Sequence, residues 1–239
     1  MNMFLSQKKF LNNVAEESVI WVCPSSVKVH YGTDNPLLDP VKILCRKKIK
    51  SNKFRQSLNK HVFMPLAPFV IPKRVFPRGV AIETMAKYER ITDLIKNIDN
   101  LESTVWYNNL TGELSLKGFS SHKKNLFYSE KSILSFLESY RNEVVLSIAS
   151  NGFSKAYTGY ASAIIDSNGC IGKTSSGNHR FFIARVLGKS SFPLRIVGVH
   201  RHWYQRLKRV SGNISYDIIL DAFKEIELRH RSDSDDNIQ

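Results

Sequence analysis

Three segments of the chain carry apolar residues at helical spacing. A repeat of three or four residues runs through residues 83–97, 129–150 and 213–230. The middle segment has the clearest boundaries, because Ser129 is a suitable N-cap and Gly152 is a suitable stop. We therefore predict three amphipathic helices, each of which buries one face against the rest of the protein.

Apolar runs bounded by turn residues predict strands between the helices. The predicted strands and hairpins lie within residues 18–30, 105–118, 162–172 and 192–200. In the third of these segments, Asp166 opens and Gly169 closes a type I turn. A shorter helix is expected over residues 178–188. This mixture indicates an α+β fold, in which helices pack against a mixed sheet.

The first 80 residues are expected to form an irregular N-terminal extension. Residues 32–40 are rich in turn formers, and prolines at positions 65, 68, 72 and 77 exclude a regular helix or central strand. We predict three parts: the extension over 1–80, a central domain over 81–210, and a C-terminal helix with an acidic tail over 211–239.

The charge of the chain is strongly positive. Among its 239 residues, 35 Lys and Arg oppose 21 Asp and Glu, for a net charge of +14. Residues 42–60 hold eight basic residues and no acid. Such a segment is either a solvated arm or a surface for a polyanion such as nucleic acid, although it lacks the regular aromatic residues of single-strand binding platforms.

Composition also limits the compartment. No stretch approaches the roughly 18 apolar residues of a membrane helix, and the N-terminal residues lack a secretory apolar core. The cysteines at positions 23, 45 and 170 are too widely spaced for a disulfide framework or a zinc site. We expect a cytoplasmic protein with no membrane partner and no metal site built from these residues.

Two phosphate-binding patterns lie within five residues of each other. Gly172-Lys173-Thr174 matches the end of a Walker A loop, but Ser167 stands where the first glycine of that motif belongs. The next residues, Thr-Ser-Ser-Gly, favour turns over the helix that a Walker loop requires. We therefore interpret this match as a coincidence and keep Lys173 as a helper that reaches a phosphate from the preceding strand.

The better candidate is the Gly-Asn-His-Arg box that begins at Gly177. The first turn of the helix behind it presents unpaired N–H groups and the positive end of the dipole, which bind anions. Gly177 permits close backbone approach, and Ser176 or Asn178 can cap the helix. Arg180 is unfavourable at a helix start unless it holds a phosphate, and His179 can donate to one. The alternative is a plain turn with a surface arginine and a space-filling histidine.

Residues from about Phe127 to Trp203 follow a recognisable order of motifs. A helix ending in SIASNGF precedes a strand with IIDSNGCIG, the SGNHRFFIARVLG loop and helix, and the strand FPLRIVGVH. This third of the chain resembles the ParB/sulfiredoxin-like superfamily, whose box is Gly-x-His-Arg or Gly-x-Arg-Arg before a helix ending in Leu-Gly and a strand begun by Pro. The matching positions are Gly177, His179, Arg180, Ala184, Leu187, Gly188 and Pro193. The trailing HRHW is similar to ParB-like proteins of bacterial polysaccharide gene clusters.

The resemblance implies nucleotide or phosphate binding at the box. Activities in the superfamily include CTP hydrolysis, ATP-dependent repair of oxidised peroxiredoxin, phosphorylation of free serine and nuclease activity. Sulfiredoxins carry Cys where this chain has Asn178, so their chemistry is not expected here. Partition-type DNA reading is not expected either, because only one obvious helix follows the match.

No catalytic residue can be assigned from the sequence. Phosphoryl transfer needs a carboxylate to take a proton or to hold Mg²⁺. Asp166 is better explained by its turn, and Glu130, Glu138 and Glu143 belong to the exposed face of a helix. Ser175 and Ser176 have no assignable base. Residues 200–209, HRHWYQRLKR, either flank the site or begin a solvated helix.

Three functions follow as hypotheses. The first is a nucleotide- or phosphate-binding protein, a candidate small-molecule kinase or nucleotide hydrolase that uses ATP, ADP or CTP with Mg²⁺. Its site residues would be Lys173, Ser176, Gly177, Asn178, His179 and Arg180. The second is a nucleic-acid-binding protein or nuclease that uses residues 42–60. The third is an inactive scaffold.

Overall fold

The computed structural model describes residues 5–153 and 159–231. Its helices are α1 (Gln7–Val14), α2 (Asp39–Lys48), α3 (Asn52–Leu58), α4 (Met64–Leu66), α5 (Ala86–Lys96), α6 (Val105–Lys117), α7 (Glu130–Tyr140), α8 (Ser147–Asn151), α9 (Asn178–Val186), α10 (Arg201–Ser211) and α11 (Tyr216–Arg229). Its strands are β1 (Val19–Val22), β2 (Val29–His30), β3 (Val70–Ile71), β4 (Val80–Ala81), β5 (Ser120–His122), β6 (Asn125–Phe127), β7 (Ala161–Ile165), β8 (Ile171–Lys173) and β9 (Phe192–His200). The predicted α+β class is confirmed. The predicted acidic tail follows Arg231 and lies outside the described residues.

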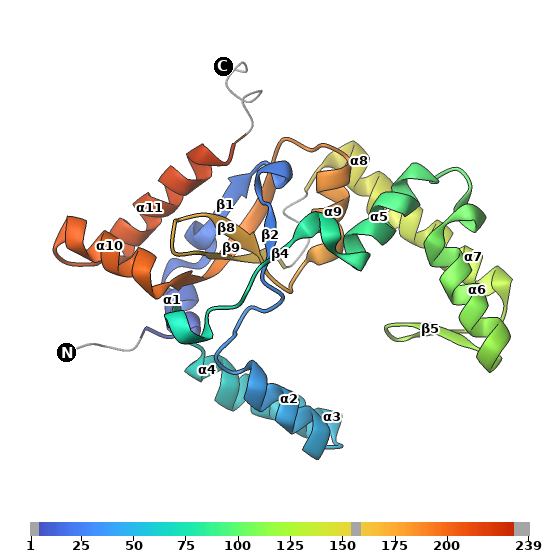
Figure 1. The fold of residues 1–239 in the computed structure, drawn as a ribbon, viewed down its shortest axis with the longest axis horizontal. Coiled ribbons are helices and arrows are strands. Elements are labelled where there is room, and N and C mark those ends of the chain that lie inside the picture. The colour runs from blue at the N-terminus through green and yellow to red at the C-terminus, as the bar shows by residue number, and fades with distance from the viewer. Residues whose placement is uncertain (1–4, 154–158, 232–239) are drawn as a thin grey trace.

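A mixed sheet of seven strands forms the centre of the protein, in the order β1-β9-β7-β8-β2-β4, with β3 also paired to β9. β9 is the longest strand: its first half pairs with β1 and its last residues pair with β3, while β7 runs parallel along its other edge. Figure 1 shows this sheet between α1, α10 and α11 on one side and α9 with α5 to α8 on the other.

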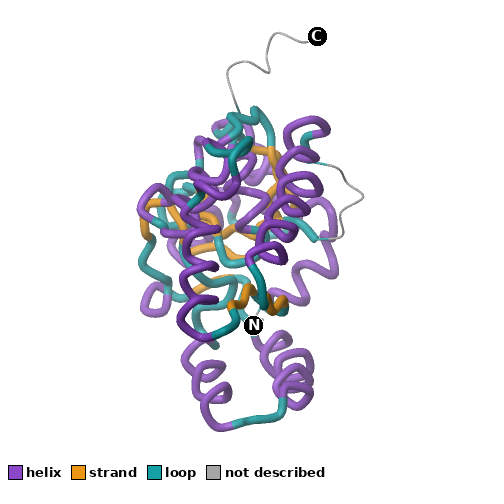
Figure 2. The backbone as a smooth tube through the Cα atoms, turned by 90° about the vertical axis from the view of Figure 1, so that its right-hand side faces the viewer, coloured by secondary structure: helices purple, strands orange, loops and turns teal. Residues whose placement is uncertain are grey.

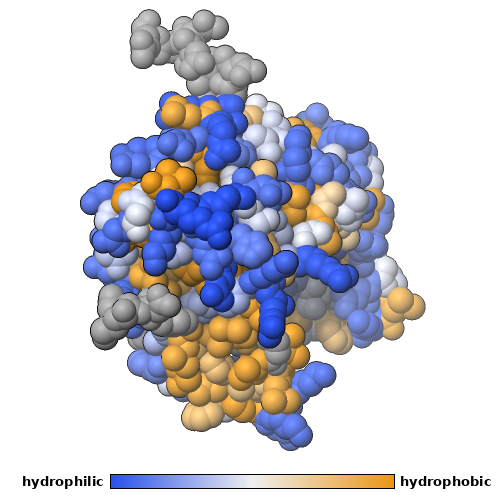
Figure 3. Space-filling model, turned by 60° about the vertical axis from the view of Figure 1, so that its left-hand side comes forward, coloured by the Kyte–Doolittle hydropathy of each residue, from blue (hydrophilic) through white to orange (hydrophobic). Residues whose placement is uncertain are grey.

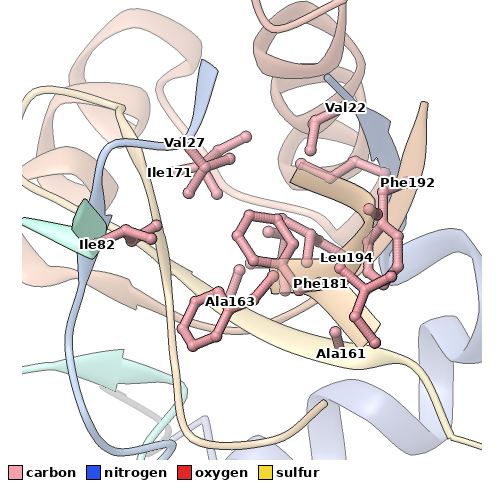
Figure 4. Close-up of a cluster of buried hydrophobic side chains, with 14 of the residues drawn as sticks. Val22, Val27, Ile82, Ala161, Ala163, Ile171, Phe181, Phe192 and Leu194 are labelled. Carbon is pink, nitrogen blue, oxygen red and sulfur yellow. The ribbon is translucent and has the colours of Figure 1, made fainter. Parts of the chain in front are cut away.

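The core covers both faces of the sheet, and its part next to the candidate loop is the contact between α9 and the sheet. Phe181 of α9 lies 5.5 Å from Phe192 of β9, ring centre to ring centre. Figure 4 shows both rings among aliphatic side chains from β7, β8 and β9. Every residue of β7 is buried, which explains why its sequence is apolar at every position except Ser162 and shows no alternation of exposed and buried residues. Because α9 is held this firmly, its first turn is a rigid platform at the edge of the sheet.

The N-terminal segment is not an irregular extension. It supplies β1, β2, β3 and β4 to the central sheet, and the expected boundary at residue 80 falls inside β4. Pro24 and Pro72 follow β1 and β3 and begin 3₁₀ turns, so they limit the length of these strands without excluding them from the sheet. Pro65 lies within the short helix α4. The basic residues 42–60 are helical, because they form most of α2 and all of α3, and most of their described side chains are exposed.

The predicted hairpin over 105–118 is wrong, because these residues form α6. The Thr104 side chain caps this helix by accepting from the N–H of Tyr107, and Gly118 ends it in the left-handed conformation with φ of 75°. Burial of Trp106 and Leu110 stabilises a helix whose Asn-Asn-Leu-Thr-Gly sequence favours a turn. The hairpin of this region is formed by the next strands, β5 and β6.

Two helices follow β9, where the sequence showed only one. α10 agrees with the solvated-helix alternative for residues 200–209, because Trp203 is its only buried residue and its other positions are mostly exposed and polar. The other helix predictions hold: residues 129–150 form α7, a π turn and α8, with Ser129 as the N-cap, and α11 covers the expected C-terminal segment. Within the described residues, no helix is both long and apolar enough to span a membrane.

Candidate functional site

The loop between β8 and α9 lies against the start of β7. Gly177, at the N-cap of α9, has φ of 72°, and a Cβ there would lie 2.6 Å from the Cβ of Ala161. Only glycine fits this position, because a side chain would be both strained and obstructed. Neither Ser176 nor Asn178 caps the helix with its side chain, contrary to expectation. Packing on β7 therefore fixes the loop in place of a side-chain cap.

The first turn of α9 keeps free donors. Among the described residues, the N–H groups of Asn178, His179 and Arg180 have no acceptor, and the first bonded amide is that of Phe181, which donates to Gly177 O. Such amides form the anion-binding end of a helix. The predicted location of the phosphate loop is thus compatible with the backbone geometry.

Gly172-Lys173-Thr174 is the end of a strand and not a Walker loop. No helix begins at Lys173, as expected. The ring of Tyr31 lies over Gly172, and a Cβ on residue 172 would lie only 2.0 Å from that ring. The Gly at 172 is therefore explained by the packing of an aromatic ring on β8.

Lys173 is fully buried beneath the loop. Its ammonium donates to the carbonyl of Thr174 at 2.7 Å and to the carbonyl of Ser176, and lies 5.9 Å from the centre of the Phe181 ring. Burial lowers the pKa of Lys173 to about 7, against the opposing attraction of Asp34. The side chain supports the loop from inside, so its contacts are with backbone carbonyls and not with the open side of the loop.

Asn178 and His179 point into the protein. Asn178 Oδ1 pairs with His30 Nε2 at 3.1 Å, and burial lowers the pKa of that histidine. His179 Nδ1 shares a hydrogen bond of 2.8 Å with the hydroxyl of Tyr140, beside the rings of Trp106 and His122. Burial, together with nearby lysines, an arginine and a histidine, lowers the pKa of His179 to about 4, so it is neutral near pH 7. Both side chains join α9 to neighbouring elements.

Arg180 is the cation of the box that reaches outward. Its guanidinium donates to the carbonyl of Gly159 at 2.6 Å and lies 5.7 Å from the centre of the Phe153 ring. It is half-buried, and its charge contributes to lowering the pKa of Lys173, which places the two cations near each other. Of the side chains predicted for this site, Arg180 is the one with a charge placed to meet an anion at the loop.

The structure brings a carboxylate to this loop. Asp34 Oδ2 accepts a hydrogen bond from Ser175 at 3.0 Å, while Oδ1 accepts from Ser162 and lies within bonding distance of the Thr174 hydroxyl. Thr174 also lies 2.7 Å from Ser162 Oγ, so its single proton serves one of these two acceptors. Ser162 and Thr174 are buried, whereas Ser175 is exposed. We call Asp34, Ser162, Thr174 and Ser175 the polar cluster.

Sheet topology explains why Asp34 meets this loop. β2 pairs in parallel with β8, with Val29 opposite Gly172 and His30 opposite Lys173. Parallel neighbours end at the same edge, so the turn after β2 and the loop after β8 leave the sheet side by side. Gln7 of α1 fixes the turn by donating to the carbonyls of Asp34 and Val197. The Gly-Thr-Asp-Asn turn indicated only a loop, and no local pattern could pair it with residues 140 positions later.

Two other acids, Asp166 and Glu83, have structural partners. Asp166 accepts from the N–H groups of Asn168 and Cys170, as expected of a turn residue. Glu83 pairs with the buried guanidinium of Arg185, which also donates to the carbonyls of Pro24 and Val27. These carboxylates stabilise the fold and lie on other elements than the loop.

The basic stretch at 200–209 lies at the other end of β7. A Cβ at Gly169, in the turn after β7, would lie 3.3 Å from the ring of Trp203, and Arg206 donates to the carbonyl of Ser167. Ala161, next to Gly177, is the first residue of the same strand. The length of β7 therefore separates α10 from the start of α9, and α10 does not flank the loop.

The oxygen atoms at the loop suit Mg²⁺ better than a transition metal. Carboxylate and hydroxyl oxygens are the ligands that Mg²⁺ prefers, and it is commonly held by one carboxylate, water and substrate phosphates. Asp34 and the exposed hydroxyl of Ser175 could supply such a half-site. In the described parts of the chain, no group of three or more His, Cys, Asp and Glu side chains could hold an ion by itself.

No family model, curated protein or solved structure matches the chain.

Proposed function

We propose that this protein binds the phosphate groups of a nucleotide at the first turn of α9 and that Asp34 provides the carboxylate for the chemistry. The observation that carries this proposal is the position of Asp34, which is hydrogen-bonded to Ser175 in the loop directly before that turn. A helix start, an arginine in its first turn and a carboxylate held by the loop before it are parts that phosphoryl transfer requires.

Each part has a distinct role. The free amides of residues 178–180 hold phosphate oxygens, and the Arg180 guanidinium turns from Gly159 to a phosphate when one is bound. Asp34 repels a bare phosphate, so it contributes to binding only through a cation or through a proton that it accepts. Asp34, with the hydroxyl of Ser175, would hold Mg²⁺, which would supply charge neutralisation for the phosphates. Nucleotide affinity is therefore expected to depend on Mg²⁺.

The acceptor is a hydroxyl group or water. A carboxylate that faces the phosphate site can take the proton of an attacking hydroxyl, which is the role of the base in small-molecule kinases and hydrolases. The exposed hydroxyl of Ser175 already donates to Asp34, so an incoming substrate hydroxyl can replace it in the same hydrogen bond. This supports phosphotransfer to a small hydroxylated molecule, or nucleotide hydrolysis in its absence, in the cytoplasm where ATP and CTP are available.

The test is a nucleotide panel with two readouts. ATP, ADP and CTP are added with and without Mg²⁺, and both the thermal shift and the release of phosphate are measured. Arg180→Ala is expected to abolish the shift, whereas Arg209→Ala, an exposed arginine on α10, leaves it unchanged. No shift with any of the three nucleotides at millimolar concentration would overturn the proposal. Binding without phosphate release in wild-type protein would instead favour the inactive scaffold.

A further inference from the structure

A helical hairpin projects from the body of the protein. Figure 1 shows α2 and α3 extending below the sheet, and Figure 2 shows them as a pair of helices joined at the far end by a short loop. α4 returns the chain to the body, where it packs against α1. We call residues 39–66 the projecting hairpin. Its surface differs from the rest of the molecule in two ways.

The first difference is exposed apolar surface. More than half of the surface of Ile43, Leu44, Phe54 and Leu66 is open to solvent, and Val41 and Val62 are also exposed. Figure 3 shows the result as a broad hydrophobic area on the lower part of the molecule, where Figure 1 places the hairpin. A contiguous apolar area on one projecting element marks a surface that another molecule covers.

The second difference is the charge. Residues 42–60 hold eight Lys and Arg and no acid, and the side chains of Lys47, Lys48, Lys50 and Lys53 are exposed. At the base of the hairpin, Lys8 and Lys9 of α1 line the same hollow as Pro65 of α4. The exposed apolar side chains of the hairpin are therefore accompanied by lysines, both on the hairpin and at its base.

This combination selects among the molecules that could cover the hairpin. A second copy would bring two sets of like charges together, which opposes association. Nucleic acid matches the charge, but its phosphates do not cover exposed Ile, Leu and Phe side chains. An anionic bilayer satisfies both properties, because its head groups attract Lys and Arg while the apolar side chains enter the boundary of the acyl chains.

We propose that the projecting hairpin docks the protein on an anionic lipid surface, with α2 and α3 in the plane of the interface. This proposal revises the expectation of no membrane partner, which rested on the lack of a stretch long and apolar enough to span a bilayer. The apolar side chains enter the head-group region to a depth of about 5–10 Å, which is the depth typical of amphipathic helices that do not span the bilayer. The lysines remain at head-group level, where their long stems reach anionic lipids. This docking does not depend on the proposed nucleotide site, which lies on other elements.

The test is sedimentation of the full chain with lipid vesicles. Binding is expected to vesicles of phosphatidylcholine mixed with phosphatidylglycerol and to be at least about tenfold weaker with phosphatidylcholine alone, since each lysine near an anionic surface adds to affinity. High salt lowers the affinity without abolishing it, because the apolar contribution is not screened.

Two variants separate the apolar and charged contributions. Ile43→Ser with Leu44→Ser keeps every charge and is expected to reduce vesicle binding by about a hundredfold. Lys47→Gln with Lys48→Gln keeps the apolar surface and reduces binding by about tenfold. The matched controls are Leu116→Ser on α6 and Lys208→Gln on α10, both exposed and away from the hairpin. Unchanged melting temperatures verify that all four proteins fold.

Each other result overturns the proposal. If the protein binds neither the anionic vesicles nor those of phosphatidylcholine alone, the hairpin does not dock on a lipid surface. If the variant Ile43→Ser with Leu44→Ser binds vesicles as well as wild type, the apolar side chains contribute nothing, and the hairpin attracts any polyanion through its charge. Tight binding of a DNA or RNA oligonucleotide that only the glutamine variant weakens assigns the hairpin to nucleic acid. A dimer in light scattering that the serine variant converts to a monomer assigns the apolar area to a second copy of the chain.

Discussion

The hydrogen bond from Ser175 to Asp34 joins the two loops that leave the sheet beside α9. Its length is 3.0 Å, and it connects residues 141 positions apart. Ser175 is exposed and Asp34 is half-buried, so the carboxylate has one oxygen held inside by Ser162 and one facing the solvent side of the loop. That orientation makes Asp34 the group on which the proposed chemistry depends.

Asp34→Asn is expected to reduce phosphate release by about a hundredfold or more, because the amide can neither take a proton nor bind Mg²⁺ as a carboxylate does. Nucleotide binding without Mg²⁺ is expected to rise, since a negative charge beside the phosphates is lost. Both effects are measured by turnover assays and by titration calorimetry with and without Mg²⁺. Asp221→Asn on α11, an exposed carboxylate paired with Lys224, serves as the control. Equal turnover in the Asp34 variant and wild type would rule out this role.

Local patterns predicted the elements near the loop between β8 and α9 well. The periodicity of α7 and α9 and the apolar run of β9 are visible because each element buries a regular set of positions. α6 was mistaken because its Asn, Thr and Gly have turn preferences that the burial of Trp106 overrides. Asp34 could not be found, because the parallel pairing of β2 with β8 depends on contacts between distant residues. Charge predicted the hairpin's basic character, whereas its exposed apolar surface required the fold.

Gly177→Ala is expected to destabilise the protein by at least about 2 kcal/mol. The new Cβ would lie 2.6 Å from the Cβ of Ala161 and 2.7 Å from its Cα, and φ of 72° disfavours any L side chain. Gly112→Ala is the matched comparison. Gly112 lies within α6 with nothing near a new Cβ, so this change should stabilise the protein by about 0.5–1 kcal/mol. Urea unfolding of both variants measures the contrast, and a loss smaller than about 0.5 kcal/mol at Gly177 would show that the loop can move away from β7.

Lys173 should make the protein more stable as the pH rises above 7. The pKa of Lys173 is about 7 in the folded protein, whereas an ordinary lysine, as in the unfolded chain, has a pKa of 10.5. Between pH 7 and 10.5 the unfolded chain therefore binds a proton that the folded protein has released. Stability therefore increases with pH across this window, by up to about 1.4 kcal/mol per pH unit from this group. Lys173→Met is expected to remove that slope, as measured by urea unfolding at pH 7, 8 and 9. Lys208→Gln provides the control, and an identical slope in wild type and Lys173→Met would mean that Lys173 stays charged.

His179 should make the protein sensitive to acid. The pKa of His179 is about 4 in the folded protein, below the ordinary value of 6.5. Between pH 6.5 and 4, His179 is therefore protonated in the unfolded chain but not in the folded protein. Stability is lost as the pH falls through this window, by up to about 1.4 kcal/mol per pH unit from His179 alone. His179→Gln removes this contribution and leaves those of His30 and His122, whose pKa values burial also lowers. Thermal unfolding from pH 7 to pH 4 should therefore show a shallower decline in the variant. Parallel curves would indicate that His179 is protonated in the folded protein and that its hydrogen bond with Tyr140 does not depend on the neutral ring.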